Sequence, residues 1–180
     1  MRPNRPRLMA LALVGAGFVI LGAATWVMLP ASPPELSAIP AQVNYAAPLL
    51  SLTDLRGNPA SLVDYRGIVV LVNNWATWCP PCKAEMPALQ AYYEAHRSQN
   101  FTIIAIEAGQ QVSEVADFVR RYGLTSPVWT DPTLKAVAAF RNPGLPSSYV
   151  IDASGTVRLA WAGAINLENL EKYVTPLLEE

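Results

Sequence analysis

Cys79 and Cys82 are the only cysteines of the chain, and two prolines separate them. A short apolar, β-branched run, Ile68–Val72, precedes them, and a segment with helical periodicity follows. This context predicts that both thiols lie at the start of a helix, close enough to form a small disulfide ring. The chemistry expected of such a pair is two-electron thiol–disulfide exchange, with no cofactor beyond the redox-active disulfide itself.

The two cysteines are expected to play different roles. If Cys79 is the N-cap residue, the unpaired amides and partial positive charge of the helix N-terminus favour its thiolate. Pro80 and Pro81 would then occupy the first two helical positions and donate no N–H, so the Cys82 amide would be the main local donor. We therefore expect Cys79 to be the exposed attacking thiol, with a moderately lowered pKa. Cys82 is expected to be the buried thiol that resolves the mixed disulfide.

Other uses of the cysteine pair fit the sequence less well. A zinc site needs about four ligands, whereas the chain has no second cysteine pair and a single histidine. This histidine, His96, is expected to be solvated near the end of the helix. A purely structural disulfide across two residues would close a very small loop and stabilise the fold little. A redox-active pair is therefore the favoured interpretation, and no metal is expected.

Glu85 is the first candidate for a proton partner of the cysteine pair. At about 100° per residue, Cys82 and Met86 share the buried face of the predicted helix, and Glu85 lies at the edge of that face. Partial burial would raise its pKa and allow it to exchange a proton with Cys82. The alternative is a solvated glutamate at the boundary of the face. Glu107, at the expected end of a strand, is a weaker candidate of the same kind.

The segments around these residues alternate between strand and helix patterns. Such alternation predicts an α/β fold, with a mixed central sheet covered by helices on both faces. Two short apolar runs around a turn, Leu49–Leu52 and Ala60–Leu62, predict an N-terminal β-hairpin. The expected strands are Ile68–Asn74, Phe101–Glu107, Val128–Thr130, Ser147–Ile151 and Val157–Ala162. The expected helices are Pro80–His96, Ser113–Tyr122, one opened by Asp131 and Pro132 and ending near Phe140, and a last one capped by Asn166.

The N-terminal residues differ in composition from the rest. Leu8–Leu29 is 22 residues long and carries no charge, which exceeds the roughly 18 apolar residues typical of a membrane span. Arg2, Arg5 and Arg7 precede it, which places the N-terminus in the cytoplasm and the remainder outside. A cleaved signal peptide is the alternative, although the apolar run is longer than usual. We expect a single-pass anchor in the cell membrane (1–29), a proline-rich linker (30–47) and a catalytic domain (48–180).

The charge balance argues against nucleic acid as a partner. The part of the chain beyond residue 29 holds 10 basic and 14 acidic residues, a net charge of −4. It contains no basic patch and no run of like charges. No nucleic-acid partner is therefore expected, and the predicted extracytoplasmic location is compatible with a disulfide.

Four segments carry motifs that, in their order along the chain, resemble those of a known family: Asp54–Gly57, Tyr65–Gly67, Leu71–Pro87 and Leu145–Gly155. They are similar to those of thioredoxin-like, TlpA/ResA-type membrane-anchored thiol–disulfide oxidoreductases, a redoxin group related to AhpC/TSA. The resemblance implies a thioredoxin-like fold with an added hairpin, Cys79 as nucleophile and Cys82 as resolving thiol. It also implies that Glu85 is the active-site glutamate and that Pro146 is a cis-proline facing the disulfide.

The resemblance also implies partners. Family members commonly reduce disulfides of extracytoplasmic proteins, including apocytochrome c during haem attachment, and a membrane thiol reductase supplies their electrons. Two residues matter for the comparison with this family. Asn73 stands where thioredoxins carry a buried aspartate, which is usual for this group and shifts proton transfer toward Glu85. Asn74 replaces an aromatic residue, and its polar group needs a partner if it is buried.

Two other functions are compatible with parts of the sequence. Thr77, two residues before Cys79, is similar to the arrangement in peroxiredoxin-like antioxidant peroxidases, although the second cysteine favours exchange with proteins. The other alternative is a non-enzymatic module that handles copper or haem. The lack of a histidine next to the cysteine pair argues against this alternative.

Overall fold

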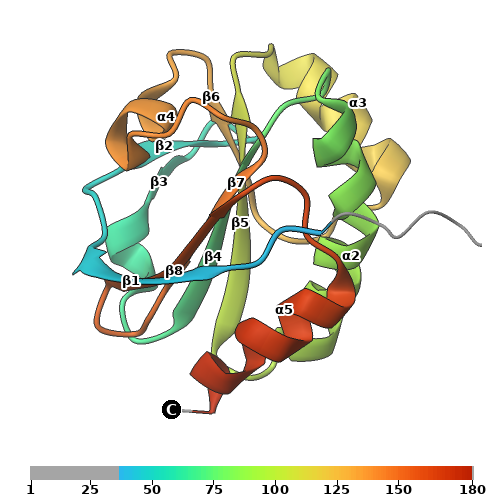
Figure 1. Ribbon diagram of the computed structural model, residues 1–180. Helices are drawn as coiled ribbons and strands as arrows, with labels where there is room; N and C mark the ends of the chain where they lie inside the picture. Colours follow the sequence, from blue (N-terminus) through green and yellow to red (C-terminus); the bar gives the residue numbers. More distant parts are fainter. Residues whose placement is uncertain (1–36, 180) are drawn as a thin grey trace, which may run out of the picture. The chain divides into compact units, whose positions relative to one another are not determined.

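The computed structural model describes residues 37–179. In this part of the chain eight strands form one mixed sheet, in the order β1-β8-β7-β4-β5-β6-β2-β3 (Figure 1). The strands are β1 (Ala41–Ala46), β2 (Ser51–Asp54), β3 (Pro59–Ser61), β4 (Val69–Trp75), β5 (Phe101–Ala108), β6 (Val128–Asp131), β7 (Ser147–Ile151) and β8 (Thr156–Ala162). The helices are α2 (Pro80–His96), α3 (Val112–Tyr122), α4 (Lys135–Phe140) and α5 (Leu167–Tyr173), with 3-10 turns η1 (Leu62–Tyr65) and η2 (Thr175–Leu178).

Strand β4 lies inside the sheet and leads directly into the cysteine pair. It pairs in parallel with β5 and antiparallel with β7. Every residue of β4 and β5 is buried, as expected for strands that are covered on both faces. The cysteine pair is therefore attached to the carboxyl end of a strand that has little freedom to move.

Two clusters of buried side chains lie on opposite faces of the sheet. Leu71 and Trp75 of β4 belong to one cluster, with side chains from α2, α3 and α5. Val70 and Val72 belong to the other cluster, with side chains from α4 and η1. Successive side chains of a strand point to opposite faces, which accounts for this division. The prediction of helices on both faces is confirmed, and Figure 1 shows α4 on the side away from α2 and α5.

Several predicted elements have the expected positions. Helix α2 begins and ends where the sequence predicted. Helix α5 follows Asn166, whose side-chain oxygen accepts a hydrogen bond from the Asn169 amide at 2.9 Å. The N-terminal hairpin is also confirmed, because β2 and β3 pair antiparallel and β2 joins the sheet at β6.

The folded domain begins earlier than the sequence predicted. Ala41–Ala46, expected in the proline-rich linker, forms β1 and pairs antiparallel with β8. All of its residues except Val43 are exposed. Its sequence does alternate apolar and polar residues, but it lies between Pro40 and Pro48, which indicated a linker. The predicted boundary at residue 48 is wrong, and the sheet already includes residue 41.

Helix α4 also begins later than predicted. Asp131 was expected to be its N-cap, but it is the last residue of β6 and the helix starts at Lys135. The Asp131 carboxylate accepts hydrogen bonds from the Lys135 amide at 2.9 Å and from the Ala136 amide at 2.7 Å. Asp131 therefore does the work of an N-cap residue for α4, because its carboxylate accepts from two free amides of the first turn. It does so from four residues before the helix, not from the position next to it.

The predicted membrane span, Leu8–Leu29, lies outside the described residues, as does the first part of the predicted linker. Within residues 37–179, no helix is both long and apolar enough to cross a bilayer. The anchor therefore stays a prediction.

Candidate active site

The two cysteines form a disulfide at the N-terminus of α2, with an S–S distance of 2.07 Å. Cys79 is the N-cap residue, and its sulfur accepts a hydrogen bond from the Cys82 amide at 3.3 Å. Pro80 and Pro81 occupy the first two positions of the helix. The predicted arrangement is confirmed: the Cys82 amide is the local donor to Cys79, because neither proline has an N–H to offer.

The exposure of Cys79 differs from the prediction. Cys79 is 3% exposed and Cys82 is 0% exposed, so both residues are buried in the disulfide form. The order of accessibility is as predicted, but Cys79 is not an exposed residue. In the described form its sulfur is bonded to Cys82 and packed within the cluster of buried side chains that also contains Trp75 and Ala76.

Glu85 lies in the core, one helical turn after Cys82. It is 1% exposed, so the alternative of a solvated boundary glutamate is wrong. Its Oε1 accepts a hydrogen bond from Asn73 Nδ2 at 2.9 Å, and its Oε2 accepts one from the Ile165 amide at 3.2 Å. Burial raises the pKa of Glu85 to about 8, although both hydrogen bonds act to lower it. Glu85 can therefore take up or release a proton near neutral pH.

The two asparagines near the end of β4, Asn73 and Asn74, are both buried, on opposite faces of the sheet. Asn73 donates to Ser148 Oγ at 2.9 Å, in addition to its bond to Glu85. Asn74 donates to Ser147 Oγ at 3.4 Å. Each amide nitrogen thus has a partner on β7. Among residues 37–179, the side-chain oxygens of both asparagines have no hydrogen-bond partner.

Pro146 lies at the same end of the sheet as the cysteine pair. The Leu145–Pro146 peptide bond is cis, as predicted. Pro146 immediately precedes β7, and the pairing of Asn74 with Ser147 places it level with the end of β4. Its carbonyl oxygen accepts a hydrogen bond from the Gly163 amide at 2.9 Å. The fold therefore brings Cys79, Cys82, Glu85 and Pro146 to one end of the sheet.

A second carboxyl group, Glu107, is fully buried near the end of β5. It pairs with Trp75 of β4, and its Oε2 accepts a hydrogen bond from the Gln110 amide at 3.0 Å. Burial raises the pKa of Glu107, while the Gln110 hydrogen bond and the Thr77 amide lower it. Glu107 was the weaker of the two predicted proton partners, because only its expected place at a strand end indicated it.

Aromatic side chains surround the loop that leads into Cys79. Trp75 is buried and its ring centroid lies 4.7 Å from that of Phe118. Trp78 is 61% exposed. Trp78 and Phe118 line a cavity of about 360 Å³ beside the site, together with Thr77, Lys83, Glu114, Asp117, Arg121 and Tyr122. The cavity beside the cysteine pair is therefore lined by aromatic and charged side chains.

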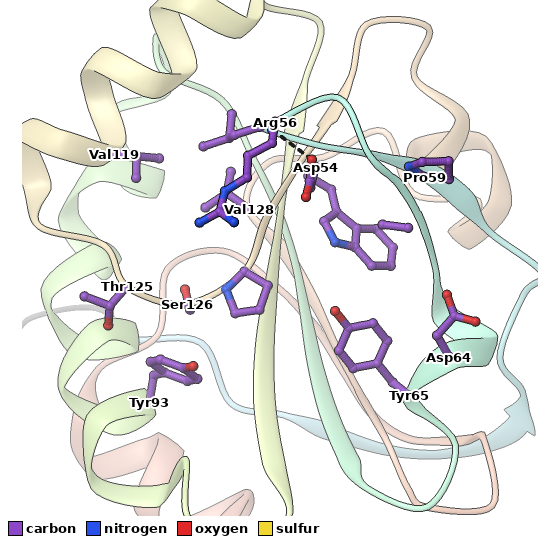
Figure 2. Close-up of a pocket in the computed structure, with 14 residues that line it drawn as sticks. Asp54, Arg56, Pro59, Asp64, Tyr65, Tyr93, Val119, Thr125, Ser126 and Val128 are labelled. Atoms are coloured by element: carbon purple, nitrogen blue, oxygen red, sulfur yellow. Dashed lines mark hydrogen bonds between the residues drawn. The ribbon is translucent and has the colours of Figure 1, made fainter.

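Figure 2 shows a different cavity, of about 680 Å³, between the N-terminal hairpin and α3. It is lined by Asp54, Arg56, Tyr65 and Tyr93 among others. None of the cysteine-site residues belongs to its lining. This cavity is separate from the redox site.

His96 is not the solvated residue that the sequence predicted. It is buried, and its ring nitrogens contact Gln99 Oε1 at 3.0 Å and Glu171 Oε1 at 3.1 Å. Burial alone would lower the pKa of His96, but these two contacts raise it. In the described part of the chain, no cluster of three or more His, Cys, Asp or Glu side chains is arranged to hold a metal ion.

Known proteins are similar to this chain in sequence. The AhpC/TSA family matches residues 43–160. The thiol–disulfide oxidoreductase ResA of Geobacillus kaustophilus is 36% identical over 132 residues, which cover 73% of this chain and 76% of that protein. ResA of Bacillus anthracis is 36% identical over 133 residues, covering 74% of this chain and 77% of that protein.

Solved structures agree with these relatives. A thiol:disulfide interchange protein of the thioredoxin family from Chlorobium tepidum is 30% identical, with a TM-score of 0.68, and the match covers 77% of this chain and 99% of that one. A secreted thiol-disulfide isomerase from Corynebacterium glutamicum has the same fold, with a TM-score of 0.72, 23% identity, and coverage of 83% and 96%. The predicted thioredoxin-like fold is confirmed. With a cysteine pair at a helix N-terminus and relatives of this kind, the chain belongs to the AhpC/TSA family and, within it, to the ResA-type thiol–disulfide oxidoreductases.

Proposed function

We propose that this oxidoreductase acts outside the cytoplasm, anchored to the membrane, and reduces disulfides of partner proteins. The observation that carries the proposal is the position of the Cys79–Cys82 disulfide at a helix N-terminus, one turn before a buried carboxyl group. Such a site holds both parts that the reaction needs, which are a nucleophilic thiol pair and a group that exchanges a proton near neutral pH.

The reaction begins with the reduced pair. The Cys79 thiolate attacks one sulfur of a partner disulfide, and the other partner sulfur leaves as a thiolate that takes a proton from water. Cys82 then loses its proton to the Glu85 carboxylate and attacks Cys79 in the mixed disulfide. The second partner sulfur leaves as a thiolate and takes a proton from water, so the partner is released as a dithiol. Two electrons have moved to the partner, the Cys79–Cys82 disulfide has formed, and Glu85 is protonated.

The raised pKa of Glu85 suits both directions of this cycle. In the oxidised form Glu85 holds a proton, since its pKa is about 8. When an electron donor attacks Cys79, the Cys82 sulfur leaves as a thiolate, and Glu85 can protonate it. A carboxyl group with the ordinary pKa would be ionised and could not act as this acid at neutral pH.

Pro80 and Pro81 favour a role in which the protein donates electrons and reduces its partner. A dithiol pair is a strong oxidant when its reduced form, with a stable thiolate, is favoured. The sulfur of Cys79 accepts a single hydrogen bond in the helix N-terminus, from Cys82, because Pro80 and Pro81 have no N–H. The thiolate is therefore poorly stabilised, which supports a role as reductant.

The location and the client rest on the N-terminal sequence and on the family. Leu8–Leu29, behind Arg2, Arg5 and Arg7, is long and apolar enough for an anchor that leaves the domain outside the cytoplasm. The client we propose is apocytochrome c, whose paired cysteines must be reduced before haem attachment. A membrane thiol reductase would return the electrons.

The reduction potential of the Cys79–Cys82 couple tests the direction of electron flow. A potential near or below about −250 mV, measured by equilibration with a thioredoxin or glutathione couple, is expected for a reductant. A potential near about −120 mV would make the protein an oxidant and overturn the proposal.

The client is tested with an oxidised peptide that carries a Cys-x-x-Cys-His sequence. The reduced full-length protein should convert it to the dithiol faster than it reduces an unrelated disulfide peptide. Equal rates on both peptides would remove apocytochrome c as the specific client, without affecting the assignment as an oxidoreductase. The location is tested by fusing a reporter that is active only outside the cytoplasm to the C-terminus.

A further inference from the structure

Ser148 lies in the core behind the carboxyl group of Glu85, on the strand that follows Pro146. It stands opposite Asn73 in the antiparallel pairing of β4 with β7, so the two side chains share one face of the sheet. Both residues are fully buried. Asn73 Nδ2 donates to Ser148 Oγ at 2.9 Å and to Glu85 Oε1 at 2.9 Å. One side-chain nitrogen thus connects the serine on β7 with the carboxyl group on α2.

Both hydrogens of the Asn73 amide nitrogen are in use. A carboxamide has two N–H donors, and here one is directed to Glu85 and the other to Ser148. A buried N–H without an acceptor is costly, because no water is available to replace the lost bond. Ser148 therefore completes the set of bonds in which Asn73 turns its nitrogen, and so a hydrogen-bond donor, toward Glu85.

The other side of the Glu85 carboxyl group is held by the loop between β8 and α5. The Ile165 amide donates to Glu85 Oε2 at 3.2 Å, so each carboxyl oxygen accepts one N–H. Burial raises the pKa of Glu85 and these two bonds lower it, and among the described residues no charged side chain contributes. The titratable neighbour on its own helix is Cys82, one turn earlier. How readily Glu85 ionises therefore depends on the two hydrogen bonds that oppose its burial.

We propose that Ser148 is a positioning residue of the oxidoreductase, which acts through Asn73 to hold the Glu85 carboxylate ready for the proton of Cys82. The inference rests on the proposed proton transfer between Cys82 and Glu85, and it adds a residue on which that step depends. The hydrogen bond of Ser148 goes to Asn73 and not to Glu85. Its effect on the carboxyl group is therefore indirect.

The effect of losing the Ser148 hydroxyl has a definite sign. One N–H of Asn73 would lose its acceptor, and the carboxamide would be free to turn its nitrogen away from Glu85. Because N–H donors favour the ionised form of a carboxyl group, the pKa of Glu85 would rise further. Less carboxylate would then be present at neutral pH to take the proton of Cys82, and the attack of Cys82 on the mixed disulfide would slow.

The first test separates this attack from the preceding step. The reduced full-length protein is mixed with the aromatic disulfide DTNB, which releases one coloured thiolate when Cys79 attacks and a second when Cys82 resolves the mixed disulfide. The rate of the first release depends on the DTNB concentration, whereas that of the second does not. A wild-type protein that released only the first thiolate would contradict the proposed function itself, and the inference with it.

S148A is expected to slow the second release about threefold to tenfold at pH 7, which corresponds to a Glu85 pKa higher by half a unit to one unit. The pH at which this rate is half-maximal should move upward by the same amount, and so should the midpoint of the Glu85 carboxyl carbon in an NMR titration. A serine that only filled space in the core would leave both midpoints unchanged. Unchanged midpoints in S148A would overturn the inference and leave the proposed function intact.

S147A is the matched control. Ser147 is the preceding residue of β7 and is equally buried, and it accepts a hydrogen bond from Asn74 at 3.4 Å on the opposite face of the sheet. The second release in S147A should therefore stay within about twofold of the wild type at each pH. An equal upward shift of the midpoint in S147A and S148A would show a general effect of changing β7, and would contradict the inference.

A double variant tests whether Ser148 acts through Asn73. N73A removes the donor itself and should slow the second release at least as much as S148A does. If Ser148 has no other route to Glu85, adding S148A to N73A should change the rate by less than about twofold. Multiplication of the two single effects in the double variant would mean that Ser148 acts independently of Asn73, and the inference would be wrong.

Discussion

Asn73 donates a hydrogen bond to Glu85 across 2.9 Å and so joins the central strand to the active-site helix inside the core. The same asparagine donates to Ser148 at 2.9 Å on the neighbouring strand. Three elements that carry the site are thereby tied through one side chain. The bond also fixes the position of the Glu85 carboxyl group that we assign to proton transfer.

The stability of the oxidised protein should fall as the pH rises, because of Glu85. Its pKa is about 8 in the folded protein and 4.5 when unperturbed. The folded state therefore binds more protons than the unfolded state between these values, and stability is lost across that window as the pH increases. The loss is on the order of 3–5 kcal/mol for this group.

The substitution E85Q isolates this contribution. Glutamine cannot ionise, so the free energy of unfolding of E85Q should vary less between pH 4.5 and 8 than that of the wild type. At low pH E85Q should be less stable than the wild type by about 1 kcal/mol. The reason is that the glutamine NH₂ group would face one of the two N–H donors from which the Glu85 carboxyl group accepts hydrogen bonds. Denaturant unfolding at several pH values measures both the stability at low pH and its change with pH. An equal slope in both proteins would mean that Glu85 is ionised in the core.

The prolines can be tested by restoring one amide. P81A gives the second helical position an N–H, which can donate to the N-cap sulfur. A better-stabilised thiolate favours the reduced form, so the reduction potential should rise by about 20–40 mV. P80A is the control, because an N–H at the first helical position does not reach the cap. Equal shifts in both variants would indicate a general effect of removing proline.

Because the two cysteines have separate roles, variants of each cysteine should behave differently. C82S should accumulate a mixed disulfide with an oxidised client, since the resolving thiol is missing and Cys79 still attacks. C79S should form no adduct. Non-reducing gel electrophoresis after mixing with the client separates these outcomes. If C82S also consumed peroxide at the wild-type rate, the peroxidase alternative would gain support.

The contact between His96 and Glu171 should stabilise the protein in a limited pH range. The raised pKa of His96 gives stability that is present below about pH 6.5 and lost as the pH rises through the folded value. The lowered pKa of Glu171 gives stability that is lost as the pH falls below about 4.5. E171Q should therefore lower the melting temperature at pH 5.5 and hardly at pH 9. Because Glu171 is partly exposed, the cost should stay below about 1 kcal/mol.

The sequence predicted those elements whose ends are set by interactions between neighbouring residues, such as helix caps and hydrophobic periodicity. The cap at Cys79 and the periodicity after it determine α2, and Asn166 determines the start of α5. Contacts between distant parts of the chain could not be predicted in this way. Glu85 is buried against the Ile165 amide, 80 residues away, and His96 against Glu171, 75 residues away. Strand β1 was missed because the prolines around it indicated a linker, although its residues alternate between apolar and polar and it pairs with β8.

The edges of the sheet have a consequence for a protein that meets extended polypeptides. An open edge offers free backbone groups on which another chain can add as a further strand and aggregate. Here one edge is β3, three residues long and opened by Pro59. The other is β1, whose register with β8 shifts between Gln42 and Tyr45. Neither edge is a long, regular template, so an unfolded client can approach the thiol pair with little risk of being captured along the sheet.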